Sequence, residues 1–271
     1  MQYAMAAPMT ANSMSSVFQH PCISVQQTKR GCLQECLGCE ARNEYKVFAG
    51  HVEQGQPRAE GIPQIAHLLE ESSCPKRFCC GEMRSFTIPL TLGDKDGEVL
   101  LEYTKPWSCP ICIHIHTDNG TIDCPCCCCL PKLHTKLPNG TFLGSSEYYC
   151  DMFCFVPKFR VRDQNGTPVY RISPDTCCGN CCVLPQCGGA GSKCLYIPFY
   201  IRDHSTSQKL DGAMPGTRAE IRKVWSGFKK ECCTTADNFQ VVFPQGSTPE
   251  MRANLLGANL LIDFTFFEQH N

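Results

Sequence analysis

The segment from Thr248 to Phe267 constrains the fold most, because its pattern predicts a helix that is apolar on every side. Thr248 can cap the helix, and Pro249 suits its first position, where a missing N–H costs nothing. A helix of this kind must be surrounded by protein or by lipid, and this one would span about 30 Å, the thickness of a bilayer core. The residues that we expect to mark this core or membrane helix are Leu255, Leu260, Ile262, Asp263, Phe264 and Phe266.

Two polar residues favour enclosure of this helix by protein. Asn259 and Asp263 are four residues apart and therefore share a face. An Asp at the centre of a membrane-spanning helix costs about 2.5–3.5 kcal/mol, even on the insertion scale. Inside a barrel, that face could meet hydroxyls and backbone groups of the strands. We favour a helix buried in a barrel and keep the membrane span as the alternative.

The rest of the chain reads as short antiparallel strands. Asn-Gly pairs at Asn119-Gly120, Asn139-Gly140 and Asn165-Gly166 predict type I′ hairpin turns. Alternating apolar residues flank these turns, and about ten such strands favour an antiparallel barrel or sandwich. The strand candidates are Ile111–His116, Phe159–Arg162, Val169–Ile172, Tyr45–Phe48, Phe86–Leu92, Glu98–Tyr103, Leu195–Ile201 and Phe239–Phe243.

The net charge limits the partners that we expect, and the N-terminal segment indicates the compartment. The chain has 25 basic and 26 acidic residues, so nucleic acid or anionic lipid could bind only through a local patch. Residues 1–20 hold no Lys or Arg and no continuous apolar run, unlike a secretory signal. We expect residues 1–31 to form a disordered tail and residues 32–271 to form the folded domain. Without a signal, the thiols should remain reduced in the cytosol.

The densest cluster of cysteines is interrupted only by Pro125, and it predicts lipidation. Adjacent cysteines do not easily form disulfides, and five thiolates exceed the four ligands of one tetrahedral zinc. Thioester acylation has no such geometric limit, and two or more chains anchor far better than one. The predicted acylation sites are Cys124, Cys126, Cys127, Cys128 and Cys129.

Other cysteines have the spacing of metal ligands. Pairs separated by two residues are typical of structural zinc sites. Their alternative role is that of small core hydrophobes, as many unpaired cysteines are. The zinc candidates are Cys109, Cys112, Cys178 and Cys181.

A group of basic residues surrounds Trp225. Such a strip could bind anionic headgroups, or it could be the solvated face of a strand. No specific nucleic-acid motif accompanies it. Its members are Arg218, Arg222, Lys223, Lys229 and Lys230.

Several short motifs, in this order, resemble the phospholipid scramblase family from about Cys32 to Glu268. They are Phe86-Thr-Ile88, Gly97-Glu-Val99, Cys109, the run Cys124–Cys129, Phe153–Phe159, Cys177-Cys178, Cys181-Cys182, Trp225-Ser-Gly227, Ala236-Asp-Asn-Phe239, Phe243-Pro244, Leu261-Ile-Asp-Phe264 and Phe266-Phe-Glu268. The resemblance implies a mainly β fold of the tubby-like type, a closed antiparallel barrel of about twelve strands enclosing the apolar C-terminal helix.

The resemblance also implies a function. It implies calcium-stimulated, ATP-independent movement of phospholipids between membrane leaflets, palmitoylation of the cysteine run, and a place at the cytoplasmic face of the plasma membrane with a nuclear pool. The alternative is an acylated tubby-like module that binds acidic phospholipid, enters the nucleus to regulate transcription and transports nothing. We see no nucleophile elbow, phosphate loop or HExxH motif, so we do not expect an enzyme.

The family's calcium segment corresponds here to residues 235–246. A loop that holds this hard cation needs carboxylates at its first, third and last positions. In this chain only the third position, Asp237, supplies one. We therefore expect weak calcium binding at most, and a strand over Phe239–Phe243 in place of a loop.

Overall fold

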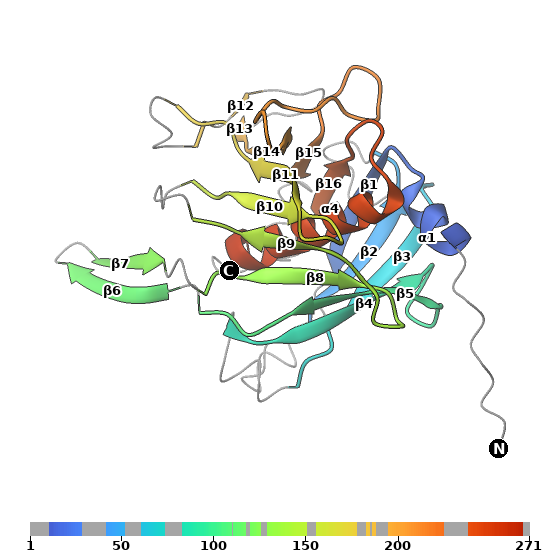
Figure 1. Ribbon diagram of the computed structural model, residues 1–271, viewed down its shortest axis with the longest axis horizontal. Helices are drawn as coiled ribbons and strands as arrows, with labels where there is room; N and C mark the ends of the chain where they lie inside the picture. The colour runs from blue at the N-terminus through green and yellow to red at the C-terminus, as the bar shows by residue number, and fades with distance from the viewer. Residues whose placement is uncertain are drawn as a thin grey trace.

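Twelve strands close into an antiparallel barrel around the C-terminal helix in the computed structural model (Figure 1). The structure describes residues 11–28, 42–51, 61–73, 83–109, 111–117, 120–125, 129–150, 156–177, 183–184, 186–187, 195–224 and 238–267. The barrel strands are β1 (Cys22–Thr28), β2 (Glu44–Ala49), β3 (Gln64–Leu69), β4 (Phe86–Leu92), β5 (Val99–Lys105), β8 (Lys132–Lys136), β9 (Phe142–Tyr148), β10 (Phe159–Arg162), β11 (Pro168–Ser173), β14 (Pro198–Asp203), β15 (Glu220–Lys223) and β16 (Asn238–Val242).

The order of the strands follows the chain except where it closes. Around the ring the order is β1, β16, β15, β14, β11, β10, β9, β8, β5, β4, β3 and β2, and β2 pairs with β1. Two small hairpins stand outside this ring: β6 (Ile111–Thr117) with β7 (Gly120–Pro125), and β12 (Gln186–Cys187) with β13 (Leu195–Tyr196). The barrel that we favoured from the sequence is confirmed.

Alternation along the strands builds the core. Side chains two residues apart lie on the same face of a strand, so apolar residues at every second position line the inside. These inward pairs are fully or almost fully buried, as in Ile23 and Val25, Tyr45 and Val47, Ala66 and Leu68, Ile88 and Leu90, Leu101 and Tyr103, Phe159 and Val161, and Phe239 and Val241.

The helix α4 (Pro249–Ile262) fills the barrel and continues as a π-helical turn, η4 (Asp263–Phe267). The hydroxyl of Thr248 accepts the N–H of Met251, and Pro249 stands at the first helical position, as predicted. Leu255, Leu260, Ile262, Asp263 and Phe264 are all buried, and Phe266 is partly buried. No helix within the described residues combines the length and the apolarity that a membrane span needs.

Polar contacts hold the helix against the strands. The Tyr45 hydroxyl donates to the Asp263 carboxylate at 2.6 Å, so one of the two polar residues on the predicted face meets a barrel hydroxyl. The side-chain amide of Asn259 has no hydrogen-bond partner among the described residues. Asn254, on another side of the helix, donates instead to the carbonyl of Leu143 at 3.1 Å, and the Ser146 hydroxyl donates to the carbonyl of Asn254 at 2.7 Å.

The predicted disordered tail is wrong over residues 11–28. Residues 11–18 form α1 (Ala11–Phe18), in which Val17 and Phe18 are buried, and β1 pairs with both β16 and β2. The Arg252 guanidinium donates to the carbonyls of Phe18 and His20 at 2.8 and 3.0 Å. The composition of this segment concealed its role, because α1 and β1 are stabilised by long-range contacts and not by local propensity.

Two of the predicted type I′ turns are also wrong. Gly140 and Gly166 have φ of +86° and +79°, but among the described residues Ser207 is the only non-glycine with positive φ. The hydrogen bonds from the N–H of Gly140 to Leu137 and of Gly166 to Asp163 instead make each a type I turn followed by a left-handed glycine. At the third site Gly120 begins β7, and Asn119 lies outside the described residues.

The strand expected over Leu195–Ile201 is interrupted. β13 ends at Tyr196 and β14 begins at Pro198, so Ile197 belongs to neither. Pro198 lacks the N–H that an uninterrupted strand would use in its ladder.

Candidate functional site

The connections between strands fall into two sets, because successive connections of an antiparallel barrel emerge at alternate ends. At the end where α4 finishes, the connections are residues 29–43, 70–85, 106–131, 149–158, 174–197 and 224–237. All cysteines except Cys22 fall in these six segments. We call this the cysteine end. The opposite end, with residues 50–63, 93–98, 137–141, 163–167, 204–219 and 243–248, is the turn end.

The predicted acylation sites belong to the connection between β5 and β8. Figure 1 shows the β6–β7 hairpin of this connection beside the barrel, at its left-hand end. Cys124 lies in β7, and Cys129 is exposed. The N–H of Cys109 donates to the carbonyl of Cys129 at 3.1 Å and joins the two sides of the connection. Cys126, Cys127 and Cys128 lie outside the described residues, so acylation stays a prediction.

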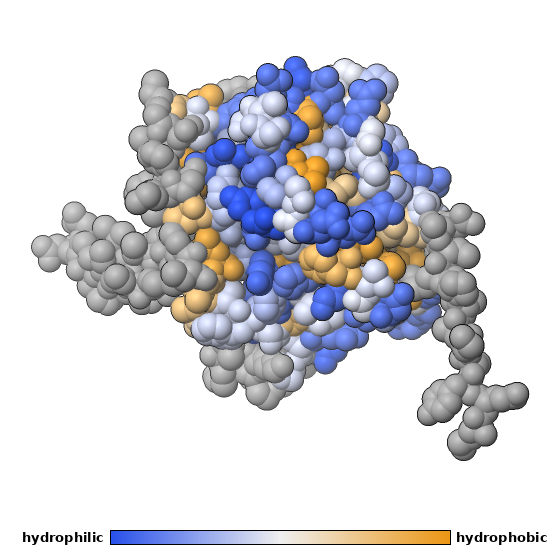
Figure 2. Space-filling model, in the orientation of Figure 1, coloured by the Kyte–Doolittle hydropathy of each residue, from blue (hydrophilic) through white to orange (hydrophobic). Residues whose placement is uncertain are grey.

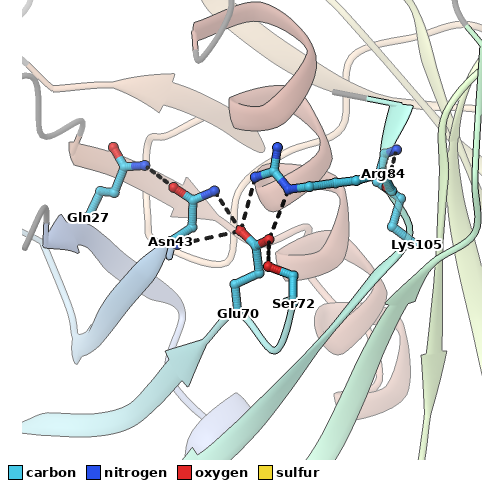
Figure 3. Close-up of polar contacts among 6 residues, drawn as sticks. All are labelled: Gln27, Asn43, Glu70, Ser72, Arg84 and Lys105. Carbon is cyan, nitrogen blue, oxygen red and sulfur yellow. Dashed lines mark hydrogen bonds and ion pairs between the residues drawn. The ribbon is translucent and has the colours of Figure 1, made fainter. Parts of the chain in front are cut away.

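Five neighbouring strands each have a polar residue at the inward position nearest the cysteine end, either in the strand or within two residues of its end (Figure 3). Each of these residues is in phase with the buried apolar side chains of its strand, as Lys105 is with Leu101 and Tyr103. All five side chains are buried. We call them the polar ladder: Gln27, Asn43, Glu70, Arg84 and Lys105.

Glu70 is the centre of the polar ladder. Arg84 donates to its two oxygens at 3.0 and 3.1 Å, Asn43 donates at 2.9 Å and the Ser72 hydroxyl at 2.6 Å. Gln27 donates in turn to Asn43 at 3.1 Å. Burial disfavours the charged form of Glu70. The hydrogen bonds and positive charge of Arg84, together with the hydrogen bonds from Ser72 and Asn43, favour the charged form and outweigh the effect of burial. The pKa of the Glu70 carboxyl therefore lies below its ordinary value.

Lys105 connects the polar ladder to the end of the helix. Its ammonium donates to the carbonyl of Arg84 at 3.1 Å and to the Ser108 hydroxyl at 2.9 Å. The charged groups of Lys105 and Arg84 each lie 5.7 Å from the centre of the Phe86 ring, and Phe86 packs on Phe264 at 4.6 Å. The buried charges thus help to fix the last turn of the helix.

Aromatic side chains complete this end of the helix. Three phenylalanines of the final turn, η4, pack against rings from three different strands, which centres the helix end in the barrel. The ring pairs are Phe264 with Phe86, Phe266 with Phe199 at 6.2 Å and Phe267 with Phe239 at 5.4 Å. The Lys223 ammonium lies 4.5 Å from the centre of the Phe267 ring.

The described part of the predicted calcium segment does not fit a cation-binding loop. Residues 238–242 form β16, which pairs with β1 on one side and β15 on the other, so its backbone groups are engaged in the sheet. Asp237 lies outside the described residues. The strand expected at Phe239–Phe243 is confirmed over residues 239–242.

The zinc candidates are only partly covered by the structure. Cys109 is half-buried in the connection after β5, Cys112 lies in β6, and Cys178 and Cys181 lie outside the described residues. Within the part of the chain that the structure describes, no three His, Cys, Asp or Glu side chains are grouped as metal ligands. Zinc binding stays a prediction.

The described basic residues around β15 have separate surroundings. Arg218 pairs with Asp211 at 2.5 Å, towards the turn end. Arg222 donates to the Gln240 side chain at 2.7 and 3.1 Å, and Lys223 lies over Phe267 inside the barrel mouth. Lys229 and Lys230 lie outside the described residues, so the patch as a whole stays a prediction, and its three described members have different partners.

Our sequence reasoning missed the polar ladder. The signal for it was present, because Lys105 continues the inward series of Leu101 and Tyr103, and Glu70 continues that of Ala66 and Leu68. A charged residue in phase with buried apolar ones indicates either a strand end or a buried partner. Which partner it meets depends on the neighbouring strand.

Comparisons with a family model and with individual proteins both identify similarity to scramblases. A model of the scramblase family matches residues 2–186 and 207–269. Human phospholipid scramblase 1 is 28% identical over 239 residues, which cover 87% of this chain and 60% of the relative. Human phospholipid scramblase family member 5 is 29% identical over 232 residues, covering 86% of this chain and 69% of the relative.

A third relative, bovine phospholipid scramblase 2, is 28% identical over 239 residues, covering 87% of this chain and 65% of the relative. The chain therefore spans between 60% and 69% of the length of these three relatives. No solved structure matches the chain at a significant level. The relatives are named for scrambling phospholipids, which is transport and not a chemical reaction, in agreement with our expectation that the chain is not an enzyme.

Proposed function

Because the chain belongs to the scramblase family, we propose that it moves phospholipids between the two leaflets of a membrane. The observation that carries this proposal is the family match along almost the whole chain, together with a barrel closed around the helix that the match includes. The process needs no covalent chemistry. It needs a lipid headgroup to cross the bilayer core, so the protein has to act while in contact with the membrane.

Reconstitution tests this proposal directly. The protein is placed in vesicles with a fluorescent phospholipid in both leaflets, and dithionite is added outside. Without scrambling, only the outer-leaflet label is bleached, whereas scrambling exposes the whole population. We expect complete bleaching without ATP and stimulation by calcium. Bleaching that stops at the outer leaflet, with protein shown to be folded and incorporated, would refute transport.

Calcium stimulation is proposed from the resemblance alone. Since residues 238–242 form a strand, we propose that calcium binds weakly or through residues outside this segment. Asp237→Ala should then change calcium-dependent scrambling only modestly. Loss of a tight calcium response in this variant would show that Asp237 is an essential ligand and that our discounting of the segment is wrong.

Burial of α4 favours the second candidate function, a lipid-binding module without transport. Leu255, Leu260 and Phe264 are enclosed by protein, so the helix offers no apolar face to lipid in this arrangement. Such a module would bind acidic phospholipid and would keep a nuclear pool when released from the membrane. Vesicle binding without any bleaching of inner-leaflet lipid would favour it over the scramblase.

We further propose that several acyl chains on the cysteine run hold the protein at the cytoplasmic face of the membrane. Each chain contributes about 0.8 kcal/mol per buried CH₂, and a single chain anchors only marginally. Replacing Cys124 and residues 126–129 by Ala should shift the protein to soluble or nuclear fractions. Unchanged fractionation, together with no hydroxylamine-sensitive lipid on the unmodified protein, would exclude acylation as the anchor.

A further inference from the structure

Four of the five large hydrophobic side chains that are exposed in the described part of the chain lie at the cysteine end. Trp107, Leu184, Ile197 and Met83 have exposed fractions of 58%, 46%, 42% and 39%. The fifth, Leu92, lies at the turn end and is 37% exposed. The four come from three different connections, so their exposure is a property of this end of the barrel and not of one loop.

Trp107 and Met83 stand next to the predicted acylation sites. The N–H of Ser108 donates to the carbonyl of Met83 at 3.2 Å, which places the residue after Trp107 beside Met83. The following residue, Cys109, makes the backbone hydrogen bond to Cys129. The exposed Trp–Met pair therefore lies at the base of the connection that carries the cysteine run.

Leu184 and Ile197 belong to a distant part of the same rim. Both lie in the connection between β11 and β14, and these strands are separated from β4 and β5 by β10, β9 and β8. A groove for a peptide would gather apolar side chains at one place. Apolar side chains at separated points of one rim can instead all enter the surface of a lipid leaflet at the same time, because that surface is flat and extends across the whole rim.

The surface around this rim suits a lipid leaflet. Figure 2 shows hydrophobic surface at the left-hand end of the barrel, where Figure 1 shows the β6–β7 hairpin, and also over the middle and right of the same face, so the exposed side chains named above identify this end. Exposed cations, Lys132 and Arg42, lie at the same end and could meet anionic headgroups. Glu71 is an exposed carboxylate there as well, so the apolar side chains carry the argument more than charge does.

We propose that the cysteine end is the membrane-docking face of the barrel, with Trp107, Met83, Leu184 and Ile197 entering the interfacial layer of a phospholipid leaflet. Trp is well suited to this layer, because its ring is apolar and its N–H can remain hydrated. Acyl chains on the adjacent cysteines would enter the same leaflet, so the two anchors act together. The choice of a phospholipid membrane as the partner rests on the proposed function.

Fluorescence of Trp107 tests the docking directly. The chain has two tryptophans, so Trp225→Phe leaves Trp107 as the only one. This variant, produced without acylation, is mixed with phosphatidylcholine vesicles containing phosphatidylserine, with or without brominated acyl chains. We expect a blue shift on binding and quenching by the brominated lipid. Binding without quenching would show that another face docks and would overturn the proposal.

Substitutions at the far side of the rim give an independent test. Leu184→Glu and Ile197→Glu should each weaken vesicle binding roughly tenfold, since each replaces a buried apolar side chain by a charge in the bound state. Leu92→Glu is the matched control, because Leu92 is similarly exposed but lies at the turn end, and it should bind as the unmodified chain does. Thermal unfolding of each variant checks that the barrel is intact.

Other outcomes would separate this inference from the proposed function. Equal binding by Leu184→Glu, Ile197→Glu and Leu92→Glu would overturn the docking face, even if scrambling persists. A concentration-dependent dimer that Leu184→Glu abolishes, without vesicle binding, would show that a second copy of the chain covers this face, and would also overturn it. Docking through Trp107 with no scrambling would support the inference and refute only transport.

Discussion

At the turn end of the barrel, several connections are turns of five or six residues that close on their own side chains, whereas the shortest connection at the cysteine end, residues 149–158, has ten. Asp94, Asn139, Asp163 and Asp203 each accept a backbone N–H from two residues further on. For Asp203, hydrogen bonds from the Ser205 hydroxyl and from Thr206 lower the pKa to about 2. These turns satisfy their polar groups locally.

The cysteine end satisfies its polar groups through contacts between strands. Glu70 is buried and depends on Arg84 and Asn43, which lie just before β4 and β2. Four large apolar side chains of this end, among them Trp107, are exposed in the described part of the chain. The turn end therefore satisfies its polar groups in water without a partner. The cysteine end combines a buried charged network with exposed apolar side chains that suit a partner.

The largest expected effect comes from a substitution in the central helix, which should destabilise both ends of the barrel. Leu260 is fully buried in the helix that both ends share, so in Leu260→Arg an unpaired guanidinium should cost several kcal/mol and unfold the barrel. Thermal unfolding and solubility without lipid measure this. Leu92→Arg, the same change at an exposed position of the turn end, is the control. A Leu260→Arg variant that remains folded and is more soluble would show that the helix faces lipid or solvent.

Removing one carboxylate from each end sharpens the contrast. Glu70→Ala takes from the buried Arg84 its carboxylate partner and should lower the free energy of unfolding by about 3–5 kcal/mol. Asp211→Ala breaks the exposed pair with Arg218 and should lower it by no more than about 1 kcal/mol. Urea denaturation of both variants compares them. Similar losses would mean that the polar ladder is no more important to stability than a surface pair.

Substitution of two glycines compares the tolerance of the barrel wall with that of a turn. Gly144 in β9 has φ +148°, and an added Cβ would lie 2.2 Å from the Asn254 amide nitrogen and 2.4 Å from the Arg162 carbonyl oxygen. Gly144→Ala should therefore cost about 2–4 kcal/mol through strain and overpacking against the helix. Gly140 has φ +86° in open space, so Gly140→Ala should cost only about 1–2 kcal/mol. Equal losses of unfolding free energy would contradict the close helix–strand approach.

Acid should weaken the cysteine end through Glu70. Because its folded-state pKa lies below the ordinary value of 4.5, Glu70 stabilises the fold fully above that value, and this contribution is lost as the pH falls through the lower folded-state pKa. Each unit by which the pKa is lowered corresponds to about 1.4 kcal/mol. The stability difference between the unmodified chain and Glu70→Gln should thus shrink in acid. Urea denaturation of both proteins over a series of pH values measures this difference, and a difference that does not change with pH would contradict the prediction.

Much of the fold could be predicted because its determinants are local. Alternation around Tyr45, Phe159 and Phe239 marked strands, and Thr248 with Pro249 marked the start of the helix. The turn type at Gly140 and Gly166 was wrong, because Pro138 and the Asp163 carboxylate favour a type I turn that the Asn-Gly pair alone does not reveal. α1 and β1 were missed, because neither has a strong local pattern.

The candidate site was predicted less completely. The cysteine run was evident, but its place beside Met83 and Trp107 depends on which strand ends meet at one rim. The basic residues from Arg218 to Lys223 seemed one patch in sequence, yet alternation along β15 sends Arg222 and Lys223 to opposite faces. The spacing of residues in the sequence predicts which side chains lie together on one strand or helix. Which side chains of different strands lie together depends on how the strands pack.

By itself the sequence determined that this chain would form short antiparallel strands around one apolar helix, since alternation, helix capping and turn chemistry act over a few residues. Only the tertiary structure decided that β1 closes the ring, that Glu70 meets Arg84 inside it, and that Trp107 and Ile197 stand exposed on the same rim. The physical reason is that burial and charge pairing depend on distances between segments far apart in the chain, which closure of the barrel fixes all at once.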